Sequence, residues 1–82
     1  RLGAMVVMDE LIEKNLDLCL QIIPQLWQQF DTLDDRVKGD LLYIFGQTRQ
    51  KEIIPYLKKV LNGDFEQEVK EAAQEALQKC NA

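Results

Sequence analysis

The side chains that most often carry chemistry are scarce in this chain. Its 82 residues include no histidine, which is the commonest general base and metal ligand in proteins. The two cysteines, Cys19 and Cys80, form no C-x-x-C pair, so their spacing fits neither a zinc site nor a thioredoxin-type centre. We therefore expect a non-catalytic protein without a cofactor. Both cysteines are expected to be free thiols in a reducing compartment, the cytoplasm, with a disulfide joining the chain ends as the alternative.

Acidic residues gather in one short segment, where Asp31, Asp34 and Asp35 could offer oxygen ligands to a divalent cation. The segment lacks the D-x-D-x-D-G spacing and the glycine turn of a calcium loop, so we predict helix caps and solvated loop instead of a metal site. Glutamates recur in pairs at helical spacing, such as Glu10 with Glu13 and Glu71 with Glu75, and such pairs could serve acid–base chemistry. We predict solvated helix faces instead.

The charge balance and the length of the apolar stretches argue against two classes of partner. The chain has 14 Asp and Glu against 10 Lys and Arg, and its net charge of -4 has the wrong sign for neutralising phosphates. A local basic patch of Lys58, Lys59, Arg49 and Lys51 is therefore predicted to be ordinary surface. No apolar stretch approaches the length that spans a bilayer. We expect neither a nucleic-acid partner nor a membrane partner.

Length and hydrophobic periodicity predict the elements that must position these side chains. A chain of 82 residues forms one domain, and apolar residues at helical spacing without period-2 runs favour an all-α fold. Helices are expected over about 5–13, 17–30, 34–48 and 53–62, with a last one of roughly 15 residues whose apolar stripe ends at Cys80. Asp34 is the expected N-cap of the third helix, and Gly46 is expected to help close it.

The chain contains an internal repeat. The segment Ile22-Ile23-Pro24-Gln25-Leu26 recurs as Ile53-Ile54-Pro55-Tyr56-Leu57 at a spacing of 31, and Val37-Lys38 recurs as Val69-Lys70 at a spacing of 32. A two-helix unit of this length cannot bury its apolar stripe alone. Such units must therefore stack on one another.

These repeated residues carry a family resemblance. The string Val37-Lys38, Ile44-Phe45-Gly46, Ile53-Ile54-Pro55 and Val69-Lys70 resembles the HEAT-like repeat of the phycocyanobilin-lyase type, although Lys replaces the usual Arg after Val. The match covers 37–77 well and 17–36 partly. It implies a right-handed stack of about five antiparallel helices, a short α-solenoid with an atypical N-terminal helix over about 1–16 and helix pairs over 17–48 and 49–80. Arrays of this family usually bind proteins, and a minority of members are enzymes.

The repeat also offers a test of exposure. Trp27 aligns with Lys58, Leu42 with Gln74, and Tyr43 with Glu75, so the second repeat carries polar residues where the first carries apolar ones. We therefore expect these three positions to face outward. For Trp27 the alternative is that the N-terminal helix or a preceding repeat covers it.

The predicted function is that of a non-catalytic helical-repeat module that binds a protein. In the family the second helix of each pair lines the concave face, so the resemblance implies one shallow surface made of Gln25, Trp27, Gln28, Tyr56 and Lys59. Tyr56 would be its anchor, and Tyr43 would lie on the convex face. One alternative is a domain or subunit of a lyase-type, chromophore-handling enzyme. The other is a purely structural piece of a longer multidomain chain.

Overall fold

The computed structural model describes residue 10 and residues 12–81. Of these residues, 85% are helical and none lies in a strand, which confirms the all-α prediction. The helix expected over 5–13 lies mostly outside the described residues. Of the described residues before Asn15, Glu10 and residues 12–14 are helical. The other elements are α2 (Leu16–Gln28), a 3₁₀ turn (Phe30–Thr32), α3 (Asp35–Gln47), a second 3₁₀ turn (Lys51–Ile53), α4 (Ile54–Asn62) and α5 (Gln67–Asn81).

Polar caps fix where the first two helices begin. The Asn15 side chain accepts a hydrogen bond from the backbone N–H of Leu18 at 3.1 Å and so opens α2. The Asp34 carboxylate accepts from the N–H of Val37 at 2.9 Å and opens α3, as its position in the sequence predicts. Both caps satisfy backbone donors that have no partner inside the helix.

The end of α3 lies in the polar run from Gln47 to Lys51, where the sequence predicts it, but Gly46 itself is inside the helix, which continues to Gln47. The residue in the left-handed region is Arg49, with φ of 53°, and its N–H donates to the carbonyl oxygen of Gly46 at 3.1 Å. The buried Thr48 hydroxyl donates to the carbonyl oxygen of Phe45 at 2.7 Å. This turn therefore ends the helix without a glycine.

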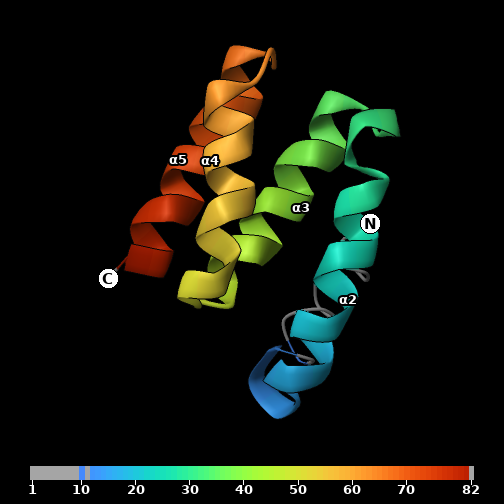
Figure 1. Ribbon diagram of the computed structural model, residues 1–82, viewed down its shortest axis with the longest axis vertical. Helices are drawn as coiled ribbons and strands as arrows, with labels where there is room; N and C mark the ends of the chain where they lie inside the picture. Colours follow the sequence, from blue (N-terminus) through green and yellow to red (C-terminus); the bar gives the residue numbers. More distant parts are fainter. Residues whose placement is uncertain (1–9, 11, 82) are drawn as a thin grey trace.

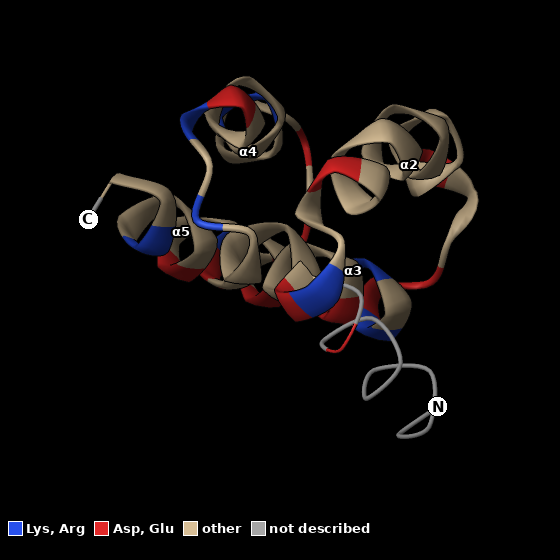
Figure 2. Cartoon of the chain, turned by 90° about the horizontal axis from the view of Figure 1, so that it is seen from below, with Lys and Arg blue, Asp and Glu red and all other residues tan. Residues whose placement is uncertain are grey.

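Helices α2 to α5 form two layers (Figure 1, Figure 2). α2 and α4 run in the same direction in one layer, and α3 and α5 run the opposite way in the other. The most extensive packing is between α3 and α5, followed by the packing of α4 on α5. Helices that are consecutive in the sequence are thus antiparallel, in agreement with the short connections between them.

The contact between α3 and α5 is unusually close at Gly46. A Cβ atom on Gly46 would lie 2.8 Å from the Cα atom of Ala76 and 2.9 Å from its Cβ atom, so there is no room for a methyl group. Gly39, about two turns earlier on α3, has nothing within 4 Å of the corresponding position. The glycine at 46 is therefore required by helix packing.

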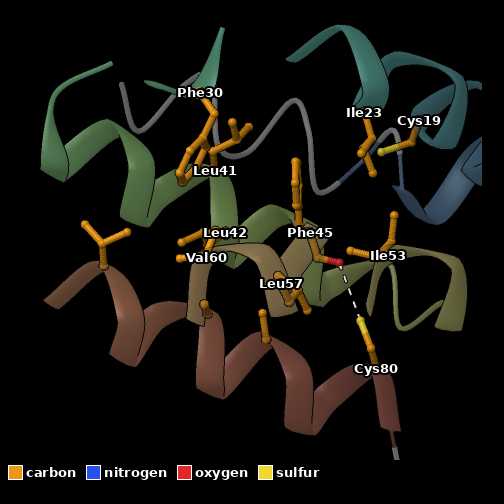
Figure 3. Packing of buried hydrophobic residues seen from close by; sticks show 13 residues of the cluster. Cys19, Ile23, Phe30, Leu41, Leu42, Phe45, Ile53, Leu57, Val60 and Cys80 are labelled. Atoms are coloured by element: carbon orange, nitrogen blue, oxygen red, sulfur yellow. Dashed lines mark hydrogen bonds between the residues drawn. The ribbon is translucent and has the colours of Figure 1, made fainter. Parts of the chain in front are cut away.

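The core fills the space between the two layers (Figure 3). Leu42 belongs to it and is 0% exposed, so the expectation that it faces outward is wrong. Its repeat equivalent Gln74 on α5 is exposed, so these two aligned positions differ in burial. Aligned positions in a stack share exposure only where both helices have the same neighbours.

The Ile-Ile-Pro motif also sits differently in its two copies. In the first copy it lies in the middle of α2, whereas in the second it spans the 3₁₀ turn and the first turn of α4. Ile23 is buried in the first copy, but the buried residue of the second is Ile53, which precedes the aligned position by one. One residue on a helix corresponds to a rotation of about 100°, so the two copies present different sides to the core.

The two glycines of α3 give a matched test of the packing. Gly46→Ala should lower the free energy of unfolding by about 1–3 kcal/mol, because backbone atoms of α5 would have to move. Gly39→Ala should raise it by about 0.5–1 kcal/mol, since alanine favours the helix and meets no neighbour. Urea unfolding of both variants measures the difference. Equal effects would contradict the close approach of α3 and α5.

Candidate functional site

Five aromatic side chains connect the two layers and will be called the aromatic cluster: Trp27, Phe30, Phe45, Tyr56 and Phe65. Trp27 of α2 lies 5.4 Å from Tyr56 of α4, measured between ring centroids, and 4.9 Å from Phe30. Tyr56 lies 6.0 Å from Phe45, and Phe30 lies 5.6 Å from Phe65 in an edge-on arrangement. These are favourable ring separations, so the cluster joins α2 to α4.

Two members of the aromatic cluster, Trp27 and Tyr56, are predicted partner-binding residues, and the structure places them in contact. Both residues are half-buried. The contact with Phe30 and Tyr56 covers Trp27 from within the described chain, so its burial does not depend on an additional repeat. A half-buried Trp–Tyr pair held in place by its neighbours is a suitable anchor for a partner.

The three polar residues predicted at this surface differ in their position relative to the Trp27–Tyr56 pair. Lys59 is exposed and lies one turn after Tyr56 on α4. Gln28 is exposed and lies about 100° around α2 from Trp27. Gln25 is exposed as well, but a separation of two residues places it about 200° from Trp27, on the opposite side of the helix. Gln25 is thus not beside the Trp27–Tyr56 pair.

Tyr43 lies in the other layer. It is 42% exposed, which confirms that it faces outward. The Lys79 ammonium lies 4.6 Å from its ring centroid and donates a hydrogen bond to the side-chain oxygen of Gln47 at 2.9 Å. Tyr43 belongs to α3 and Lys79 to α5, and acidic residues occupy the outer side of these two helices in Figure 2. Tyr43 therefore marks a surface separate from the Trp27–Tyr56 pair.

A lysine closes one end of the aromatic cluster. The Lys38 ammonium lies 5.8 Å from the Phe30 ring centroid and 5.3 Å from that of Phe65, while Asp35 is 3.9 Å away. Only 13% of the Lys38 side chain is exposed. The sequence analysis did not find this arrangement. The available signal was Phe65, a large apolar residue in the otherwise polar connection between α4 and α5.

The remaining candidate groups have structural roles. Asp34 is a helix cap, and no group of three or more His, Cys, Asp or Glu side chains in the described part of the chain could hold a metal ion. No helix among the described residues is long and apolar enough to cross a membrane.

Both cysteines are free and buried, at 0% exposure for Cys19 and 2% for Cys80. Burial raises the pKa of each thiol above its ordinary value. The Cys80 thiol also lies 3.9 Å from the carbonyl oxygen of Phe45, to which it donates a weak hydrogen bond (Figure 3). The protonated form of both side chains is therefore favoured, and neither is arranged as a nucleophile.

Comparison of this chain with protein-family models, curated proteins and solved structures finds no match.

The cysteines give a prediction about pH. The unfolded chain ionises its thiols near the ordinary value of 9.0, whereas the folded chain keeps them protonated to higher pH. Their contribution to stability is thus complete below that value and is lost as the pH rises through the folded-state pKa values. Urea unfolding between about pH 8 and pH 10 should show this loss. A variant with Cys19→Ala and Cys80→Ala should show a shallower decrease, and an identical decrease would contradict the assignment.

Proposed function

We propose that this chain is a non-catalytic helical-repeat module that binds a protein partner through the surface around Trp27 and Tyr56. The observation that carries the proposal is the contact between these two half-buried rings, which come from α2 and α4. Trp and Tyr are enriched where interfaces concentrate their binding energy. The exposed Lys59 and Gln28 would supply the polar margin of the interface.

Preorganisation supports this choice of surface. The pair is supported by Phe30 and Phe45, so a partner would not have to order the two rings on binding. The small exposed area of two half-buried rings suits a short segment of a partner, bound weakly unless further contacts extend the interface.

The proposed architecture is a short HEAT-like stack. It is supported by the repeated segments, the alternating antiparallel directions of α2 to α5, and their arrangement in two layers. The buried free thiols suit a reducing compartment, and we propose that the protein acts in the cytoplasm.

One observation favours a second function, that of a structural unit in a longer helical array. Leu18 of α2 is 42% exposed, and Ile22 and Leu26 on the same side of the helix are half-buried. An apolar flank of this kind could pack against another helix. The natural coding sequence upstream of Met5 would show whether further repeats precede this one.

The binding surface is tested with a partner isolated by affinity capture and then purified. A variant with Tyr56→Ala and Lys59→Ala should lose most of its affinity, at least about tenfold, because the anchor and its flanking charge are removed. Gln25→Ala is the matched control on the far side of α2 and should bind normally. Calorimetry or anisotropy titration provides the measurement.

Stability must be measured alongside binding, since Tyr56 also packs on Phe45. Tyr56→Ala should cost about 2 kcal/mol, so circular dichroism is needed to show that the variant is folded at the temperature of the titration. Unchanged binding in this variant, together with loss of binding in Tyr43→Ala, would move the site to the outer side of α3 and α5.

A further inference from the structure

The connection between α4 and α5 begins with the dipeptide Asn62-Gly63. Asn62 is the last residue of α4 and is exposed. Gly63 has already left the helix, with φ of -91° and ψ of -179°, and its N–H donates to the carbonyl oxygen of Val60 at 3.2 Å. The hydrogen bond from the Gly63 N–H to Val60 thus holds the peptide group between Asn62 and Gly63 at the helix end.

We propose that Asn62 is a site of spontaneous deamidation, a covalent modification that needs water alone. The backbone nitrogen of Gly63 attacks the side-chain carbonyl carbon of Asn62. A new C–N bond forms, the bond to the side-chain nitrogen breaks, and that nitrogen leaves as ammonia with the proton from the Gly63 N–H. Water then opens the resulting succinimide at either carbonyl, giving aspartate or isoaspartate at position 62.

The local structure makes this attack accessible. The Gly63 nitrogen must rotate toward the Asn62 side chain, which breaks its hydrogen bond to Val60 and unwinds the last residue of α4. Helix ends open locally more readily than helix interiors. Glycine also adopts backbone angles that other residues resist, so the absence of a side chain at Gly63 lowers the steric barrier to this rotation.

The other described asparagines lack this combination. The Asn15 side chain is engaged as the cap of α2, where it accepts from the N–H of Leu18, and the bulky Leu16 follows it. Asn81 is followed by Ala82, whose methyl group hinders approach of the backbone nitrogen more than a glycine does. Asn62 should therefore react first.

The structure also explains why a glycine stands at this place. A Cβ atom on residue 63 would lie 2.7 Å from a ring carbon of Phe65 and 3.0 Å from the carbonyl oxygen of Lys59. Phe65 packs against Phe30 and under the Lys38 ammonium, so the close turn serves to insert that ring. The tight turn that anchors Phe65 thus leaves Asn62 next to the residue type that hinders its deamidation least.

The modification would add a negative charge at the C-terminal end of α4. A carboxylate is unfavourable there because the last carbonyl groups of a helix carry partial negative charge. The isoaspartate product would also add a methylene group to the backbone between α4 and Phe65. Neither consequence depends on the protein-binding function proposed above.

The experiment incubates the folded chain in mildly alkaline buffer at body temperature, digests samples with trypsin and analyses them by liquid chromatography and mass spectrometry. The peptide of residues 60–70 contains Asn62 as its only asparagine, and the peptide of residues 15–36 contains Asn15 as its only one. We expect the first peptide to be replaced progressively by two products in which oxygen has replaced the NH of the amide, while the second stays unchanged.

Two controls define the outcomes. A synthetic peptide of residues 60–70 reports the rate without the fold, and an Asn62→Gln chain should yield no such products on the same timescale. The proposal is overturned if the synthetic peptide reacts while the folded chain stays intact over many half-lives of the peptide. It is also overturned if Asn15 reacts as fast as Asn62 in the folded chain.

Discussion

Gly46 and Ala76 bring the backbones of α3 and α5 so close together that a methyl group cannot fit between them. Small residues make this contact, and other side chains of α3 reach the core: Leu42 and Val60 belong to the same buried cluster, and Phe45 meets Tyr56 of the other layer (Figure 3). Close packing of one pair of helices thus leaves the second pair, α2 and α4, to be joined by aromatic rings. Trp27 and Tyr56, the rings that join these two helices, are half-buried, and the candidate binding site lies around them.

Periodicity was sufficient to predict the helices, because each stripe of apolar residues follows one helix face. The prediction that Asp34 caps α3 is also confirmed, because an N-cap depends only on local hydrogen bonding. What the sequence could not predict depends on neighbours. Leu42 is buried and Gln74 exposed at equivalent positions since their helices have different surroundings. The role of Gly46 could not be predicted either, because a glycine near a helix end indicates a stop unless the facing helix is known.

In the candidate site, too, the sequence predicts residue types but not the contacts between elements. The sequence singled out Trp27 and Tyr56 by residue type, and the structure places them in contact. Gln25 was misplaced although its spacing carried the information, since two residues along a helix lie about 200° apart and Gln25 therefore faces away from Trp27. Lys38 was missed for a similar reason: its ring partners lie in other elements, and a lysine on a helix predicts a solvated side chain.

Trp27 is the only tryptophan of the chain, and it stands at the contact between α2 and α4. Its intrinsic fluorescence is therefore a natural spectroscopic probe of this one contact. Emission would shift to longer wavelength when α2 separates from α4 and water reaches the indole, even while α3, α4 and α5 remain packed. Far-ultraviolet circular dichroism, by contrast, reports helix content throughout the chain. Disagreement between the two signals during unfolding would reveal whether the chain melts as one unit or loses α2 first.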